Sequence, residues 1–311
     1  MSTPSIRRPA AARPKASADH TTRLLMLLNH RDRRILDLVW EHRVLTTFQI
    51  GAVFFTSPKT TRKVLARLHH AGALERFQPR SDDRGSIPIR WTLAPAGAYA
   101  VAAMRGQTVK ELRYRRDHLH QFVLSQKLNH HLGVADFFTS LHAHARLHED
   151  RNVEQWWSER ACFTEWGDLA QPDAFGRWTE PVNGAPTALE FFLEHDTGTE
   201  TLARVAAKLP GYAKVMTRHR IRVPILFWLP NPTREANLRA LLGTPAVPIA
   251  TAVNTMGTAP GGPVPGDRTA NGPAGPVWLP AGTTGPRRTL IGLRTAWDAH
   301  NRPRPITPPG V

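Results

Sequence analysis

Two acidic residues and a lysine in the second half of the chain have the types and spacing of a metal-dependent phosphodiesterase. Asp173 follows a proline, and Glu194 lies 21 residues further along, in the run ALEFFLEHD. As a strand this run alternates between two faces, which puts Glu194 and Asp196 on the same face. Lys208 lies in the segment that follows, where charged residues recur at the spacing of a helix.

Carboxylates on adjacent strands suit Mg²⁺, a hard cation that prefers oxygen ligands. A bound Mg²⁺ polarises a phosphate and lowers the pKa of a water, and a lysine can stabilise the charge that develops. We therefore predict Asp173, Glu194 and Lys208 as catalytic residues, and Asp173, Glu194 and Asp196 as ligands of Mg²⁺. The alternative is that these acids merely lie at the edge of a strand, beside a row of charged residues on the protein surface.

The neighbouring elements must position these residues. The continuous apolar run 223–229 (VPILFWL) is typical of a buried central strand. Glu200, Arg204 and Lys208 recur at i, i+4 and i+8, which predicts a helix with these residues along one stripe. Pro210-Gly211 is expected to interrupt that helix just beyond Lys208.

The first third of the chain has the signals of three helices and a hairpin. A helical apolar pattern begins at Asn29, and Thr46 or Thr47 can cap a short second helix. Ser57-Pro58 supplies an N-cap and a first-turn proline for a third helix, which Gly72 ends. Two strand-like runs, 73–78 and 87–93, and a closing helix over 95–104 follow. This order is that of a winged helix-turn-helix.

The third helix is amphipathic, with a basic outer face narrow enough for a major groove. We predict that it binds double-stranded DNA together with the loop that joins the two strands. The predicted DNA-binding residues are Lys59, Thr60, Arg62, Lys63, Arg67, Arg80, Arg84 and Arg90.

The charge distribution agrees with this division. The 311 residues include 41 Lys and Arg against 25 Asp and Glu, a net charge of +16. Residues 1–115 carry 21 − 8 = +13, whereas residues 116–311 carry 20 − 17 = +3. Residues 149–200 reverse the sign, at 3 − 12 = −9. A basic first third attracts polyanions such as DNA, and a local acidic excess is compatible with either a divalent-cation site or solvated surface.

Other classes of protein are disfavoured. The single cysteine, Cys162, excludes a disulfide framework and a thiolate zinc cluster. No apolar run approaches the roughly 20 residues of a membrane-spanning helix. We therefore expect a cytoplasmic protein with no membrane partner.

Seven of the 15 histidines lie between residues 110 and 148. The pairs His118-Leu-His120 and His142-Ala-His144 have the His-x-His pattern of relaxases, which hold a metal from a strand. The surrounding period is helical, and on a helix positions i and i+2 point about 200° apart. Polar histidines on helices are therefore favoured, and a relaxase using Tyr114 or Tyr212 as its nucleophile is a weaker alternative.

These observations predict a chain of the α/β (α+β) class with two domains. A disordered basic arm (1–22) precedes a winged-helix domain (23–115) and a helical linker (116–148). The second domain (149–242) is followed by a disordered Gly/Pro-rich insertion (243–276), elements that return to the second domain (277–300) and a disordered tail (301–311).

The combined motifs resemble the replication-relaxation family of bacterial plasmid and mobile-element proteins. The resemblance runs from about Arg31 to Leu229, and a further short match lies at VWLP (277–280). The segments that carry it include SPKTTRKVLARLHHAGAL, RWTLAPAGA, QPDA and LEHDTGTETLARVAAKL. It implies a winged-helix half, and a second half with the mixed sheet of restriction endonucleases, whose signature is Pro-Asp followed by Asp/Glu-x-Lys. Asp173 and Glu194 match the two acids. Asp196 occupies the lysine position, so Lys208 is the expected substitute.

The predicted function is DNA binding in plasmid or mobile-element replication or relaxation, with Mg²⁺-dependent DNA nicking by the second domain. Double-stranded DNA is the expected partner, with other plasmid replication or transfer proteins as further partners. The alternative is a non-catalytic DNA-binding replication or transcription regulator with a degenerate nuclease-like domain.

Overall fold

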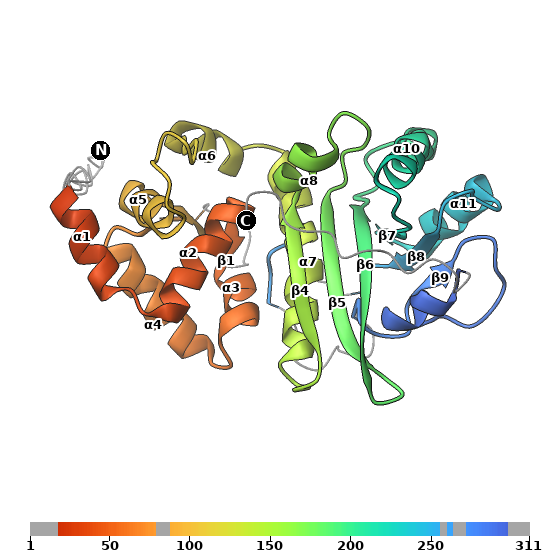
Figure 1. Ribbon diagram of the computed structural model, residues 1–311, viewed down its shortest axis with the longest axis horizontal. Coiled ribbons are helices and arrows are strands. Elements are labelled where there is room, and N and C mark those ends of the chain that lie inside the picture. Colours follow the sequence, from red (N-terminus) through yellow and green to blue (C-terminus); the bar gives the residue numbers. More distant parts are fainter. Residues whose placement is uncertain (1–17, 79–87, 256–259, 264–271, 298–311) are drawn as a thin grey trace, which may run out of the picture.

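The computed structural model describes residues 18–78, 88–255, 260–263 and 272–297. Figure 1 shows the helices of the first third at one end of the molecule and a six-stranded sheet at the other. The chain is therefore of the mixed α/β class, as predicted.

The first unit combines five helices with a small antiparallel sheet. The helices are α1 (Ala18–Leu27), α2 (His30–His42), α3 (Thr47–Phe54), α4 (Pro58–His70) and α5 (Pro95–Met104). The strands are β1 (Leu45–Thr46), β2 (Leu74–Phe77) and β3 (Arg90–Leu93), in the order β1-β3-β2. Helix α1 begins at Ala18, inside the segment for which a disordered arm is predicted; residues 1–17 lie outside the described residues.

The predicted helix starts in this unit are confirmed. Asn29 and Asp32 form a capping box at the start of α2, because each side chain accepts a hydrogen bond from the backbone of the other. Ser57 caps α4 by accepting from the backbone N–H of Thr60, and Pro58 occupies the first turn. The interpretation of this unit as a winged helix stays a prediction.

Two helices follow, α6 (Arg116–Val123) and α7 (Lys127–Ala145). Both histidine pairs of the sequence lie on them, so the predicted helical setting is confirmed. Phe137 and Phe138 of α7 are fully buried and contact Phe191 of the large sheet, with ring centroids 5.9 and 5.8 Å apart. Helix α7 therefore covers one face of that sheet.

The large sheet has the order β4-β5-β6-β7-β8-β9. Its strands are β4 (Asn152–Ser158), β5 (Ala174–Val182), β6 (Ala185–His195), β7 (Ile225–Leu229), β8 (Ile249–Val253) and β9 (Leu279–Pro280). Strands β4, β5 and β6 pair antiparallel, β6, β7 and β8 pair parallel, and β9 is antiparallel to β8. Every residue of β7 is buried, as a central strand requires.

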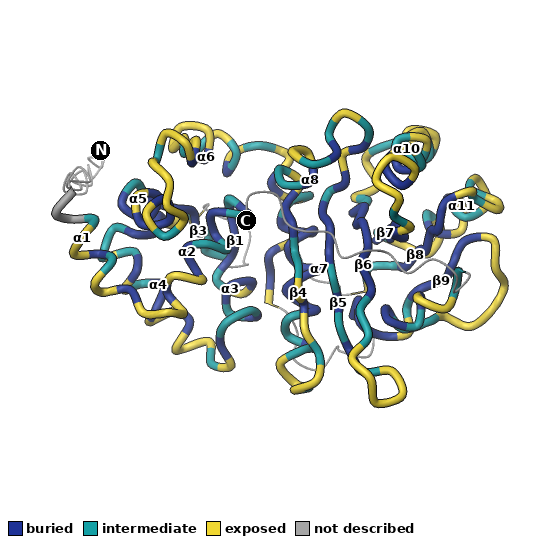
Figure 2. Tube along the Cα trace, in the orientation of Figure 1, coloured by how far each residue is buried: buried dark blue, intermediate teal, exposed yellow. Residues whose placement is uncertain are grey.

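Most residues in the strands of the large sheet are buried (Figure 2), and they contribute to a core on each face. Leu189, Phe191 and Leu193 of β6 belong to the core beneath α7, and Phe192 belongs to the core on the opposite face. This confirms the predicted alternation. The opposite face packs against α8 (Glu159–Trp166), α10 (Leu209–His219) and α11 (Pro232–Leu242).

The composition misleads in the segment 243–276. It predicts a disordered insertion, whereas residues 249–253 form the buried strand β8 beside β7. A five-residue apolar run is long enough for a strand but too short to stand out among glycines and prolines. Residues 256–259 and 264–271 lie outside the described residues. Trp278, Leu290 and Leu293 return to the core under α7, as expected.

The two units are held together by buried polar contacts. Gln49 of α3 donates to the carboxylate of Asp136 on α7 at 2.8 Å and to the carbonyl of Leu132 at 2.9 Å. His42 at the end of α2 stacks on Trp156 of β4, with ring centroids 3.7 Å apart. In the part of the chain described here, no helix has the length and apolarity needed to cross a membrane.

Candidate functional site

The register of β5 and β6 brings the two predicted acids together. Ala174 pairs with Leu193, so the antiparallel register places Asp173 opposite Glu194. The backbone N–H of His195 donates to Asp173 Oδ2 at 2.8 Å, which fixes one side of this carboxylate. Two acids therefore lie side by side at one end of the sheet.

Glu194 is 3% exposed and receives a donor on each carboxylate oxygen. Lys208 Nζ lies 2.6 Å from Oε2, and the hydroxyl of Tyr212 donates to Oε1. Lys208 Nζ also lies 3.9 Å from Oε2 of Glu200. The predicted lysine therefore reaches the second acid, and the structure brings Asp173, Glu194 and Lys208 into one cluster.

The helix that carries this lysine differs from the prediction. A short helix α9 (Leu202–Ala206) ends before Lys208, and α10 begins directly after it. Pro210 lies in the first turn of α10, where the missing N–H costs no hydrogen bond, so it starts a helix instead of interrupting one. Lys208 stands at the junction, and its side chain turns to Glu194.

Asp196 is part of a different arrangement. Strand β6 ends at His195, so Asp196 lies beyond the alternation. One of its carboxylate oxygens accepts from Arg234 Nε and the other from the backbone N–H of Gly198, both at 2.6 Å. Arg234 is thus the cation that Asp196 faces.

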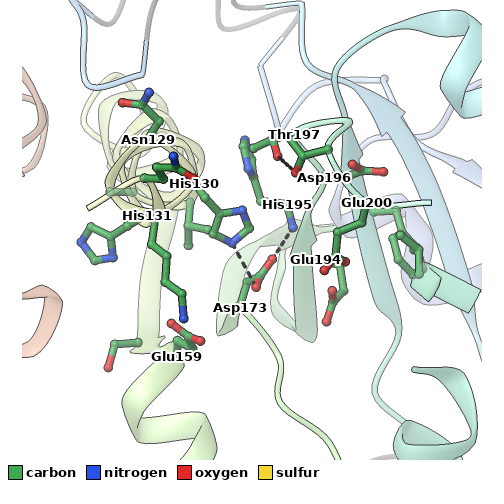
Figure 3. Close-up of a pocket in the computed structure, with 18 of the residues that line it drawn as sticks. Asn129, His130, His131, Glu159, Asp173, Glu194, His195, Asp196, Thr197 and Glu200 are labelled. Atoms are coloured by element: carbon green, nitrogen blue, oxygen red, sulfur yellow. Dashed lines mark hydrogen bonds and ion pairs between the residues drawn. The ribbon is translucent and has the colours of Figure 1, made fainter. Parts of the chain in front are cut away.

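Two histidines complete the cluster around Asp173 (Figure 3). His130 Nε2, on the first part of α7, lies 3.1 Å from Asp173 Oδ1. The ring of His195 meets that of His130 edge to face, with centroids 5.4 Å apart. A β-carbon at Gly133 would stand 2.6 Å from Nε2 of His195, so only glycine lets α7 lie against this ring.

The electrostatics of the two acids differ. Burial raises the pKa of Asp173, but the hydrogen bond and charge of His130 outweigh it, so the pKa is lowered overall. For Glu194, burial and the negative charge of Asp173 raise the pKa to about 7, although Lys208 and Tyr212 oppose the rise. Burial lowers the pKa of His130 and of Lys208, and in both cases the facing carboxylates outweigh it and raise the pKa.

A cavity of about 630 Å³ is lined by His130, Asp173, Glu194 and Lys208, among others. Asp173, Glu194 and His195 lie at its sheet side, and Lys127 and Phe122 contribute from α7 and α6. In the described part of its lining, five carboxylates stand against two lysines, which gives the cavity an excess of acidic groups. The carboxylates are those of Glu159, Asp173, Glu194, Asp196 and Glu200, and the lysines are Lys127 and Lys208.

Two facing carboxylates in a negatively charged cavity fit a divalent cation. Mg²⁺ is usually bound through one or two carboxylates and keeps several waters, so Asp173 and Glu194 suffice as protein ligands. Each of their oxygens has a second lone pair beyond the hydrogen bond it accepts. Among the described residues, no group of three or more His, Cys, Asp and Glu is arranged to hold a metal ion. Asp173 and Glu194 are therefore the residues that could hold a cation here, with water in its other positions.

The predicted DNA-binding residues that the structure describes belong to the first unit, and none of them lines this cavity. Lys59, Thr60, Arg62 and Lys63 of α4 are exposed on one face, opposite its buried residues. Arg67 is 45% exposed and pairs with the buried Asp32 at 2.6 Å, so it also has a structural contact. Arg90 is partly buried on β3, and Arg80 and Arg84 lie outside the described residues.

His130, His195 and Tyr212 contact the site but are absent from the predicted set. His195 directly follows Glu194 in the sequence, so its position next to a predicted acid could have indicated it. His130 comes from a helix 43 residues before Asp173, and only the histidine-rich composition of that stretch points to it. Tyr212 stands four residues after Lys208, one helical turn away, which predicts a shared face.

The fold and the cavity define an α/β protein with paired carboxylates and a lysine at one end of a mixed sheet. Residues 36–224, more than half of the chain, match the family described as replication-relaxation. The chain belongs to this family, which supports a role in the replication or relaxation of plasmids or mobile elements. Neither a curated protein nor a solved structure shows significant similarity to the chain.

Proposed function

We propose that the protein is a Mg²⁺-dependent DNA-nicking protein of plasmid or mobile-element replication. The observation that carries this proposal is the cluster of Asp173, Glu194 and Lys208, in which two acids on adjacent strands face each other and a lysine contacts the second. Family membership supplies the biological setting.

Asp173 and Glu194 would hold the cation, with His130 and Tyr212 orienting their carboxylates from behind. A divalent cation supplies Lewis-acid polarisation of a phosphate and lowers the pKa of a bound water. Lys208 is then the cation that stabilises negative charge as it develops on the phosphate. Asp196 is not included among the proposed ligands because it lies beyond the end of β6, outside the facing pair of Asp173 and Glu194.

The first unit would deliver this site to DNA. Helix α4 presents four exposed polar or basic residues within little more than one helical turn. The order of helices and strands in the unit is the one expected of a winged helix. Phosphate contacts by such residues fix the protein on a duplex, while the second domain acts on a strand nearby.

A tyrosine nucleophile is disfavoured by the same geometry. Tyr212 is 1% exposed and donates to Glu194, and burial raises its pKa well above the ordinary value. The hydroxyl of Tyr114 donates to the carbonyl of Leu93 at 3.0 Å, and burial raises its pKa as well. A phenol whose hydroxyl is held by Glu194 or by a backbone carbonyl is poorly placed to attack a phosphate.

Supercoiled plasmid incubated with the protein and Mg²⁺ tests the proposal. We expect conversion to open circles, abolished by chelation and by Asp173→Asn, with no covalent protein–DNA adduct on a denaturing gel. Asp168→Asn is the matched control, because Asp168 is an exposed acid that pairs with Arg218 outside the cavity. Equal nicking by wild type and Asp173→Asn would refute the assignment, and DNA binding without cleavage in any divalent cation would favour the non-catalytic regulator.

A further inference from the structure

The two acids lie too deep for the backbone of an intact duplex to reach them. Glu194 is 3% exposed, and the side chain of Asp173 is 14% exposed. Their cavity, at about 630 Å³, lies within the range of roughly 300–1,000 Å³ that holds a small-molecule-sized ligand. A nucleotide is such a ligand, whereas a double helix is far wider than a cavity of this volume.

Among the residues that the structure describes, two buried ring nitrogens in the lining have no hydrogen-bond partner. They are Nε2 of His42 and Nδ1 of His195, and the two residues are 3% and 9% exposed. Both residues line the cavity. Buried polar atoms without partners are uncommon in folded proteins and call for an explanation. Both atoms have almost no accessible surface, so a ligand with hydrogen-bonding groups at two points, as a nucleotide has, would satisfy them once the two rings turn toward the cavity.

The cavity also has aromatic surface suited to a base. Trp156 already stacks on both His42 and Phe138. Phe122 lies half-buried beside His131, with ring centroids 5.2 Å apart, and both of these residues line the cavity. Unpaired bases stack on such side chains with little regard to sequence.

We infer that this cavity receives a nucleotide that has left the duplex, so the substrate is single-stranded or locally melted DNA. The inference rests on the proposed nicking function and specifies its substrate class. Because carboxylates outnumber lysines in the lining, an anionic strand should enter only when a divalent cation is bound.

The test compares one 30-nucleotide sequence in three forms: single strand, full duplex, and duplex with a central unpaired bubble. Full-length protein with Mg²⁺ should cut the single strand and the bubble at least tenfold faster than the duplex. Correspondingly, supercoiled plasmid should be nicked faster than the same plasmid relaxed by a topoisomerase. Cleavage of the full duplex at an equal or higher rate would overturn the inference and leave the nicking proposal standing.

Phe122→Ala separates stacking from the chemistry. The KM for the single strand should rise about tenfold while kcat changes less, because Phe122 touches neither Asp173 nor Glu194 among its contacts. Phe163→Ala is the matched control, since Phe163 is 57% exposed on α8 and does not line the cavity. An unchanged KM in Phe122→Ala would contradict the stacking role.

If no form is cut, the nicking proposal fails and binding alone decides the inference. The binding arm uses the Lys59→Ala, Arg62→Ala, Lys63→Ala triple variant, which lacks the predicted duplex-binding face, with a 10-nucleotide single strand in Ca²⁺ or in chelator. Tight binding that requires Ca²⁺ and is weakened by Phe122→Ala supports the inference. Absent or Ca²⁺-independent binding overturns it.

Discussion

Asp173 and Glu194 face each other at the end of β5 and β6, yet the carboxyl group of each is held by a different side chain. His130 approaches Asp173 from α7, and Lys208 approaches Glu194 from the start of α10. The two acids are therefore held by elements that pack on opposite faces of the sheet.

Lys208→Gln should reduce the nicking rate by about 10²–10³-fold, because removing one group that stabilises transition-state charge has an effect of this size. The KM should change less than kcat. Lys214→Gln is the control, since Lys214 is an exposed lysine of α10 outside the cavity lining. A wild-type kcat in Lys208→Gln would remove the lysine from the mechanism.

Gly133→Ala should destabilise the protein, because its new methyl group would overlap the ring of His195. Overpacking of this kind costs about 1–3 kcal/mol in the free energy of unfolding. The double variant Gly133→Ala, His195→Ala removes the overlap and should recover part of the loss, as a double-mutant cycle in urea can measure. Gly285→Ala is the control, because a β-carbon there meets no atom within 4 Å. Strictly additive effects would show that the two residues do not interact.

The raised pKa of Glu194 predicts a pH-dependent difference in stability. Its pKa is about 7 in the folded protein against an ordinary 4.5, because burial and Asp173 disfavour the charged form. The folded state then holds the proton longer than the unfolded state, so this residue's contribution to stability falls as pH rises from 4.5 through 7.

Buried histidines with lowered pKa values, such as His131 and His195, change the stability in the opposite direction. The informative quantity is therefore the difference in stability between a variant and wild type at the same pH. Relative to wild type, Glu194→Gln should be more stable at pH 8 than at pH 5, as thermal unfolding at each pH can show. Adding Mg²⁺ at pH 8 should stabilise wild type and leave the variant unchanged. A difference that does not vary with pH, or that matches the control Glu149→Gln, would contradict the assigned pKa.

Replacing Lys59, Arg62 and Lys63 together by Ala should weaken duplex binding strongly while the fold stays intact. Loss of up to three phosphate contacts should lower the slope of log K against log salt by up to about 2.7, at roughly 0.9 for each contact. Lys110, Arg113 and Arg294 are exposed and allow a control triple variant with the same loss of charge. Undiminished affinity and an unchanged salt slope would show that α4 is not the DNA-binding helix.

Much of the site could be predicted from local sequence, because the alternation of side chains along a strand determines which residues share a face. Asp173 and Glu194 follow from one alternating run and a preceding Pro-Asp. Lys208 was predicted on a helix that in fact divides at that residue. His130 could not be derived, because the packing of α7 against the sheet, and not any local pattern, brings it to Asp173. Strand β8 was missed for a related reason, since its neighbours in the sheet, and not its composition, stabilise it.

Anomalous diffraction from crystals soaked in Mn²⁺ tests the central claim most directly. We predict a single strong peak between Asp173 and Glu194, at about 2.0–2.2 Å from an oxygen of each, which is lost in Asp173→Asn. A peak at Asp196 and Glu200 instead, or no peak at the facing acids in a protein that nicks DNA under the same conditions, would contradict the account.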